Sequence, residues 1–333
     1  MKPSDIFKRG KEDTLHLDIN KRAYNHVPGE CGVIPNLPGI LSLTTSTGGR
    51  LYMTTNSKDG LSDQTHLFTF YPDNRTAREI DIKGAPAKYR IKPGPISVTV
   101  EPNNPNIFVL NRRTGNVDVF ETNEQSDSWS FKKSLKSKNF DGLTELSASG
   151  PNSFYFVKSS NIGNSFAFNL FERIFPIATG EVCVASGRVV QHVSYISSPT
   201  GVVFDPLRKT LFITSFARNS IYVMKMEKKS KIVATKEYNL GCSPTSIWKD
   251  FDGSFLITCQ QVRFRYLLFM MDVASSSTSQ VLRATVPVDE EKDLIITQLY
   301  SNDGATISLA NMTVRAGRSL LISNGAKILN CHL

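Results

Sequence analysis

Short apolar runs separated by polar turns recur along the whole chain. Six of them are β-branched or aromatic in character and begin at Leu51, Ile107, Phe154, Leu211, Phe255 and Leu320. Their starts are 56, 47, 57, 44 and 65 residues apart, which indicates one supersecondary unit used six times. Each interval provides about four short strands, the content of one propeller blade. The pattern therefore predicts an all-β fold, a six-bladed β-propeller.

The apolar runs predict two kinds of strand. Segment 116–121 alternates apolar with polar residues, which predicts a strand with one polar face. Segments 201–204 and 267–271 are apolar throughout, which predicts strands buried on both sides. Segment 164–176 differs, because several of its apolar residues follow helical spacing. It predicts a short amphipathic helix or an aromatic loop, for which packing between blades and contact with a partner or a membrane surface remain alternatives.

The polarity of the chain predicts two regions, an N-terminal arm over residues 1–38 and the propeller over residues 39–333. The arm is polar, interrupted by prolines and poor in periodicity. No run of about 20 apolar residues occurs, so no transmembrane helix is expected. The first thirty residues contain no apolar run typical of a signal peptide. Taken alone, this last observation predicts a cytosolic protein.

The formal net charge of +9 includes two local lysine runs, at Lys132, Lys133, Lys136 and Lys138 and at Lys228, Lys229 and Lys231. Neither run is interleaved with the aromatic residues on which nucleic-acid bases stack. We therefore expect solvated faces and no nucleic-acid partner. Weak attraction to an acidic membrane surface remains an alternative.

The five cysteines include one near each end of the repeat array, Cys31 and Cys331. A disulfide between them would hold the first and last blades together by removing entropy from the unfolded chain. Such a bond needs an oxidising compartment, and the sequons at Asn74 and Asn311 point the same way as candidate glycosylation sites. No C-x-x-C spacing occurs and the five histidines are dispersed, so a zinc site is not expected.

Three stretches carry a resemblance to a known family. They are Gly142-Leu-Thr-Glu-Leu-Ser-Ala-Ser-Gly-Pro-Asn-Ser-Phe-Tyr, Thr200-Gly-Val-Val-Phe-Asp-Pro and the C-terminal Ala326-Lys-Ile-Leu-Asn-Cys-His-Leu. From about Cys31 to Leu333, the chain resembles the serum paraoxonase/arylesterase family. The resemblance implies a six-bladed propeller that holds calcium in its channel and hydrolyses lactones and aryl esters. It also implies a bond between Cys31 and Cys331, and a free thiol at Cys259.

The resemblance places the family's functional positions on residues of a different chemistry. Its calcium ligands are carboxylates and amides, and their positions here hold Ser42, Leu43, Thr144, Thr200, Pro244 and Thr245. Its two histidines, proposed to activate water, correspond to Gly94 and Arg112. Calcium prefers dense carboxylate and carbonyl oxygens, and neither Gly nor Arg acts as a general base near neutral pH. We therefore expect no catalytic residues at these positions and no cofactor, with calcium present only in a hydrolase.

Few other residues suggest a site. Asp141 and Glu145 flank Thr144 and could form a weak cation site. The histidines are expected on the surface or in packing.

Two functions follow from the sequence and the resemblance. The first is a non-catalytic paraoxonase-like propeller that acts by binding, as a secretory-pathway chaperone or as an accessory subunit of a membrane protein such as an ion channel. Paraoxonase-like proteins of nematodes assist sodium channels of the degenerin class in this way. The alternative is a divergent arylesterase or lactonase that uses other residues. Both place the protein in the endoplasmic reticulum lumen, on a membrane or outside the cell. A third class, a soluble scaffold that binds acidic surfaces through its basic turns, predicts steep salt dependence.

Overall fold

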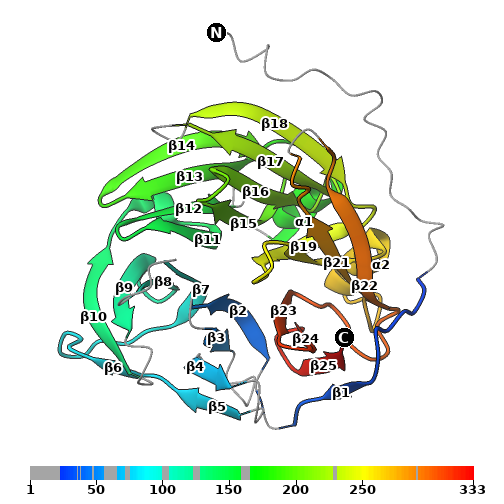
Figure 1. Cartoon of the computed structure of the whole chain (residues 1–333), viewed down its shortest axis with the longest axis horizontal. Coiled ribbons are helices and arrows are strands. Elements are labelled where there is room, and N and C mark those ends of the chain that lie inside the picture. Colours follow the sequence, from blue (N-terminus) through cyan, green and yellow to red (C-terminus); the bar gives the residue numbers. More distant parts are fainter. Residues whose placement is uncertain are drawn as a thin grey trace.

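The computed structural model describes residues 23–35, 37, 39–46, 49–55, 66–71, 76–99, 105–122, 128–158, 166–227, 231–289 and 292–333. Within these residues the strands form six sheets, which are arranged in a ring around a central axis (Figure 1). The predicted six-bladed β-propeller is therefore confirmed.

Blades one to three follow one another along the chain. Blade one contains β2 (Ile40–Thr45), β3 (Leu51–Thr55), β4 (His66–Tyr71) and β5 (Thr76–Glu79). Blade two contains β7 (Pro93–Val98), β8 (Asn106–Asn111), β9 (Asn116–Thr122) and β10 (Ser128–Leu135), and β6 (Asp81–Lys83) adds a fifth, parallel strand at its outer edge. Blade three contains β11 (Leu143–Gly150), β12 (Ser153–Lys158), β13 (Gly180–Ser186) and β14 (Val189–Ile196). A short 3-10 turn at Lys138–Phe140 leads from blade two into blade three.

Blades four and five repeat this arrangement, and blade six closes the ring. Blade four contains β15 (Pro199–Asp205), β16 (Thr210–Ser215), β17 (Ser220–Met226) and β18 (Ile232–Asn239). Blade five contains β19 (Ser243–Lys249), β20 (Phe255–Gln260), β21 (Ser279–Thr285) and β22 (Ile295–Asn302). Blade six contains β23 (Met312–Ala316), β24 (Ser319–Ser323) and β25 (Ile328–His332), and its outer strand is β1 (Cys31–Val33).

The six apolar runs of the sequence share one place in the fold. Each begins in the second strand of a blade, namely β3, β8, β12, β16, β20 or β24. Those second strands are flanked on both sides by strands of the same sheet and are almost wholly buried, as the patterns of β16 and β20 show. Strands of this kind can be apolar on both faces, and this explains why the repeat was visible.

The ring is closed by pairing between the two ends of the described chain. β1 pairs antiparallel with β25, with Cys31 opposite Cys331. The two cysteines form a disulfide with a Cα–Cα distance of 4.1 Å across 300 residues of sequence, which confirms the predicted bond. Three residues of the predicted arm, Cys31–Val33, thus form part of the last blade (Figure 1).

The hydrophobic core lies between neighbouring blades. Tyr52 of blade one packs with Phe120 and Trp129 of blade two, and all three side chains are fully buried. Similar clusters join blades two and three, three and four, and four and five, while one larger cluster joins blades five, six and one. Because each blade buries one side against the next, the inner strands are held in register around the axis.

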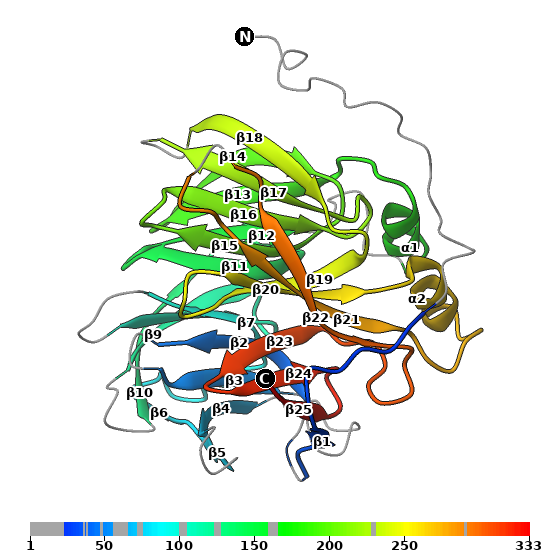
Figure 2. The same ribbon diagram turned by 45° about the vertical axis from the view of Figure 1, so that its right-hand side comes forward.

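Two helices interrupt the strand pattern. The predicted helix in segment 164–176 is present as α1 (Phe166–Ile174), whereas the predicted strand at 267–271 is wrong, because these residues belong to α2 (Arg263–Met270) and the turn that follows. An apolar run alone does not distinguish a buried strand from a buried helix. The helices lie at one side of the ring (Figure 2), where Leu170 and Ile174 pack near Phe216 and Tyr266. Among the described residues, neither helix is long and apolar enough to cross a bilayer.

The predicted polar face of segment 116–121 is also wrong. Asp118 lies in β9 and is only 1% exposed. Its carboxylate accepts hydrogen bonds from the hydroxyl of Tyr89 at 2.6 Å, from Nδ2 of Asn111 at 2.9 Å and from the hydroxyl of Ser134. A buried carboxylate is tolerated where several donors compensate for the lost water.

Candidate functional site

The first strand of each blade faces the central axis, and the space that these strands enclose is the candidate site. A cavity of about 260 Å³ is lined by residues of β2, β7, β11, β15 and β19 and by Met312 of β23. Leu43 and Glu145 belong to its wall. An axial cavity bordered by five or more blades is the usual place for a ligand or metal in this architecture.

The first strands of blades one to five share a local irregularity near their beginnings. Pairing with the second strand shifts between Ile40 and Ser42, between Pro93 and Ile96, between Leu143 and Glu145, between Pro199 and Gly201 and between Pro244 and Ser246. These β-bulges re-aim the intervening side chains. Gly94, Thr144, Thr200 and Thr245 lie inside the bulges, and Ser42, Leu43 and Pro244 lie beside them. The positions singled out from the sequence therefore gather around one end of the channel.

The three threonine hydroxyls at these bulges donate to backbone carbonyls. Thr144 Oγ1 donates to the Val157 carbonyl at 3.2 Å, within its own blade. Thr200 Oγ1 donates to the carbonyl of Pro244 at 2.9 Å and thereby joins blades four and five. Thr245 Oγ1 lies 3.1 Å from the carbonyl of Thr258 and 3.2 Å from that of Ala310, at the approach to blade six. Two of the three hydroxyls thus connect neighbouring blades.

Further hydrogen bonds between side chain and backbone complete a ring of six junctions. The remaining junctions are Ile96 N to Ser42 Oγ at 3.2 Å, Ala148 N to Ser97 Oγ at 3.0 Å, Phe204 N to Ser147 Oγ at 2.9 Å and Asn311 Nδ2 to the Ile40 carbonyl at 3.3 Å. Every pair of neighbouring blades is therefore joined near the axis by a hydroxyl or an amide. Ser42, one of the positions carried over as a calcium ligand, serves here as an acceptor for the next blade.

Gly94 and Arg112 are coupled in space. Gly94 is buried in the bulge of β7, and Arg112 lies in the turn between β8 and β9 with its backbone N–H donating to the Lys92 carbonyl at 2.8 Å. A Cβ placed on Gly94 would lie 2.8 Å from Nε of Arg112 and 3.2 Å from its Cγ. The arginine side chain therefore occupies the space that a side chain at residue 94 would need. The histidine that the family pattern has at residue 94 could therefore not be restored without moving Arg112.

Glu145 is one of two acidic residues that line the cavity, together with Asp250. Oε1 of Glu145 accepts the backbone N–H of Leu146 at 3.1 Å. Burial raises the pKa of Glu145 from 4.5 to about 8, although the Leu146 N–H and the positive charge of Arg112 oppose the rise. A carboxyl group with a pKa of about 8 favours its protonated, uncharged form at neutral pH.

This donor set does not fit calcium. The ion requires six to eight oxygen ligands with several carboxylates among them. The carried-over positions supply hydroxyl groups, a leucine and a proline. Of the two carboxyl groups that line the cavity, Glu145 favours its protonated form and Asp250 pairs with Arg315 at 3.0 Å. Within the part of the chain that the structure describes, no three His, Cys, Asp or Glu side chains gather into a possible metal site. Asp141 is exposed at the end of the 3-10 turn, whereas Glu145 lines the cavity.

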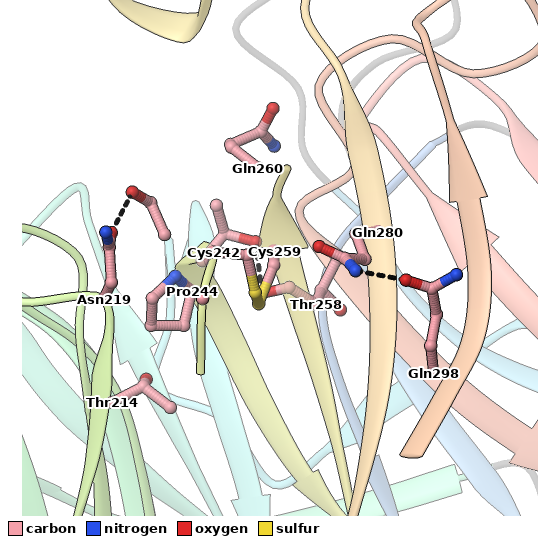
Figure 3. Close-up of a disulfide and its surroundings, with 12 residues drawn as sticks. Thr214, Asn219, Cys242, Pro244, Thr258, Cys259, Gln260, Gln280 and Gln298 are labelled. Carbon is pink, nitrogen blue, oxygen red and sulfur yellow. Dashed lines mark hydrogen bonds between the residues drawn. A yellow bond between two sulfur atoms is a disulfide. The ribbon is translucent and has the colours of Figure 1, made fainter. Parts of the chain in front are cut away.

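The expected free thiol at Cys259 is wrong. Cys259 forms a disulfide with Cys242, just before β19, and the two lie beside Pro244 and Thr258 at the end of blade five (Figure 3). Both cysteines are buried. The unpaired cysteine is Cys183, which is buried in β13. The resemblance did not provide for Cys242, and a pairing across 17 residues has no spacing signature in the sequence.

The structure describes only one of the two candidate glycosylation sites, Asn311. Asn74 lies outside the described residues. Asn311 is partly buried, and the amide nitrogen that would carry a glycan donates to the Ile40 carbonyl between blades six and one. This contact makes Asn311 a poor acceptor for a glycan.

Sequence reasoning also missed a group of basic residues beside the channel. Lys88, Arg90, Arg113 and Lys136 surround a recess above Asp118. Lys136 belongs to the lysine run noted in the sequence, whereas Lys88, Arg90 and Arg113 lie in other segments and outside any local charge run. Of the two lysine runs, Lys228 and Lys229 lie outside the described residues, and Lys132 forms an ion pair with Glu121.

Comparison with known proteins agrees with this architecture. Mechanosensory abnormality protein 6 of Caenorhabditis elegans is 26% identical over 95% of this chain and 90% of its own length. Human serum paraoxonase/lactonase 3 is 23% identical over 80% of this chain and 76% of its own. A luciferin-regenerating enzyme of known structure shares the fold with a TM-score of 0.59 at 9% identity, covering 92% of this chain and 95% of its own. The model of the family described as Arylesterase matches residues 11–333. This chain therefore belongs to the arylesterase family.

Proposed function

We propose that this chain is a non-catalytic member of the arylesterase family that acts by binding. Its role would be that of a secretory-pathway chaperone or an accessory subunit of a membrane protein such as an ion channel. The proposal rests mainly on the side-chain contacts at the channel mouth, the end of the central channel around which the carried-over positions gather. The hydroxyls of Thr200 and Thr245 brace neighbouring blades, and the side chain of Arg112 fills the space above Gly94.

The chemistry at the mouth supports binding over hydrolysis. Hydrolysis of an ester needs a group that activates water and a cation or donor that stabilises the oxyanion. Gly94 has no side chain, and Arg112 stays protonated near neutral pH, so neither accepts a proton from water. The proposal therefore includes a channel that holds no calcium and has no esterase activity.

Two further observations support the class of partner and the compartment. The Caenorhabditis elegans relative spans nearly the whole chain, and its name refers to mechanosensation and not to hydrolysis. Two disulfides, Cys31–Cys331 and Cys242–Cys259, favour the oxidising environment of the secretory pathway. There the propeller would meet membrane proteins as they fold and assemble.

The proposal is tested in two arms. In the first, purified protein is assayed against a panel of lactones and phenyl acetate, with calcium and with chelator, beside human serum paraoxonase/lactonase 3 as the positive control. We expect turnover at the buffer background in both conditions, and hydrolysis that chelator abolishes would overturn the non-catalytic reading. In the second, a sodium channel of the degenerin class is co-expressed with and without the propeller. Greater surface abundance of the channel is expected, and unchanged abundance and current would count against an accessory role.

A second candidate is a divergent arylesterase or lactonase that uses Glu145. The raised pKa of this carboxyl, about 8, is suited to general acid or base chemistry near neutral pH, and the group lines the channel cavity. Any turnover found in the substrate panel would be repeated with Glu145→Gln. Loss of that turnover would favour the hydrolase, whereas unchanged turnover would remove Glu145 from consideration.

A further inference from the structure

An open recess lies at the edge of blade two, next to the channel mouth. Its volume is about 750 Å³, and its wall is formed by Lys88, Tyr89, Arg90, Asn111, Arg113, Thr114, Asn116, Asp118, Ser134 and Lys136. At this edge β7 begins, β8 ends, β9 begins and β10 ends, as the pairings Pro93 with Asn111 and Asn111 with Asn116 show. We call this recess the basic pocket.

Four cations surround the basic pocket, and they come from three segments of the chain. Lys88 and Arg90 precede β7, Arg113 lies in the turn between β8 and β9, and Lys136 follows β10. All four residues are exposed. Among the residues that the structure describes, none of their side chains forms an ion pair or a hydrogen bond. Four positive charges are thus held close together, and none of them belongs to an ion pair within the described part of the chain.

Cations elsewhere on the propeller are commonly paired. Arg208 contacts Asp205 at 2.6 Å, and Arg218 contacts Glu237 at 2.9 Å. Arg315 contacts Asp250 at 3.0 Å. The four cations of the basic pocket therefore differ from these three arginines, each of which has an acidic partner. Uncompensated like charges repel one another, so their proximity has an energetic cost unless an outside anion offsets it.

The acidic residue that lines the pocket forms no ion pair with these four cations. Asp118 is buried, and its oxygens accept from Tyr89, Asn111 and Ser134. Asn111 is fixed in turn, since its Oδ1 accepts the backbone N–H groups of Lys92 and Arg113. This network joins the three segments that carry the cations. Their backbones are thereby held in place, while their charged groups remain available to solvent.

The charge of this region extends beyond the four residues. Segments 80–99, 105–122 and 128–141 together contain ten lysines and arginines and four aspartates and glutamates. An excess of this size accelerates the approach of an acidic partner. The pocket then provides fixed positions for several negative groups at once.

We propose that the basic pocket binds an acidic peptide segment of a protein partner. The proposal rests on the proposed function, because it names the chemistry by which a partner would be recognised. A single phosphate would engage only part of a recess of about 750 Å³ whose cations lie on three segments. An extended segment with several Asp or Glu side chains matches that distribution. The recessed shape also favours a protruding peptide over a flat bilayer surface.

The experiment measures binding of a fluorescein-labelled peptide of alternating Glu and Ser, with its Gln and Ser counterpart as the uncharged probe. The test variant is Lys88→Gln, Arg90→Gln and Arg113→Gln in one chain. Its matched control is Arg188→Gln, Lys209→Gln and Arg318→Gln, which removes the same charge from exposed turns at the opposite strand ends. Fluorescence anisotropy is recorded at low and at physiological salt. Both variants are first compared with the wild-type protein by thermal unfolding.

We expect the acidic peptide to bind the wild-type protein and the uncharged probe not to bind. The pocket variant should weaken binding by about tenfold, and the control variant should change it within about twofold. A variant with Arg90→Lys and Arg113→Lys should keep most of the wild-type affinity, because lysine carries the same positive charge as arginine.

Three results would overturn the proposal. Equal weakening in both triple variants would indicate diffuse attraction to net charge. Displacement of the peptide by low concentrations of inorganic phosphate would indicate a small-anion site. Binding of phosphatidylserine vesicles, with no peptide binding, would indicate a lipid surface. If the peptide binds but the propeller leaves the surface abundance of the co-expressed sodium channel unchanged, that result would count against the proposed function alone.

Discussion

The protonation state of Glu145 predicts how stability depends on pH. Glu145 lines the channel, and burial raises its pKa from 4.5 to about 8. Between these two values the native state retains a proton that the unfolded chain has released. The native state then binds more protons than the unfolded state, so the free energy of unfolding falls as pH rises from about 4.5 to about 8. Glu145→Gln removes this dependence and preserves the acceptor for the Leu146 N–H.

The size of the effect follows from the same shift. A rise of the pKa from 4.5 to about 8 corresponds to at most about 5 kcal/mol once the group is ionised in both states. Glu145 is only partly buried and faces a channel that water can enter, which reduces the cost of its ionised form. We expect Glu145→Gln to match the wild-type protein at about pH 5 and to exceed it by about 2 kcal/mol at about pH 9.

The assay is guanidinium-induced unfolding of both proteins across this pH range, followed by intrinsic fluorescence. Asp81→Asn serves as the control, because it removes one negative charge from an exposed residue of β6. The difference in unfolding free energy between Glu145→Gln and the wild-type protein should grow steadily with pH, whereas the control difference should stay small. A constant difference across the range would refute the reasoning, since it would mean that Glu145 titrates alike in both states.

Further predictions concern the elements that hold the ring together. Replacing Cys31 and Cys331 by alanine should lower the unfolding free energy by about 5 kcal/mol, because this disulfide closes a loop of 300 residues. Replacing Cys242 and Cys259 by alanine should lower it by about 3 kcal/mol, because that loop spans 17 residues. Denaturant unfolding of both variants measures this, and an equal or smaller loss for the long loop would contradict the ring-closing role. Thr245→Val should lose about 1 kcal/mol relative to Thr245→Ser, since only serine keeps a hydroxyl for the carbonyls of blades five and six. Equal stability of these two variants in the same assay would show that the hydroxyl contributes nothing.

Much of the fold could be predicted because its determinants are local. The second strand of every blade is apolar on both faces, and this pattern is repeated in order along the chain. The pairing of Cys31 with Cys331 followed from the need of any ring to join its ends. The presence of Gly94 and Arg112 at the two positions where the family pattern has histidines could also be noted from the sequence. Their contact could not, because it depends on a bulge in one strand and a turn in the next.

The remainder depends on contacts between segments that are distant in sequence. Asp118 alternates with apolar neighbours as a surface residue would, and only the donors Tyr89 and Ser134 make its burial tolerable. The apolar run at 267–271 has the composition of a strand, yet it ends a helix that packs near Phe216. The basic pocket has no sequence signature, since its cations are brought together by the pairing of four strands.

We propose that hydroxyl and amide side chains, in place of calcium, brace the blades at the channel mouth. Isothermal titration of calcium into chelator-treated protein tests it most directly. We expect no binding tighter than about 1 mM and no change in thermal stability, since the carried-over positions contribute no carboxylate. Stoichiometric binding in the micromolar range, with a matching rise in the unfolding temperature, would contradict it.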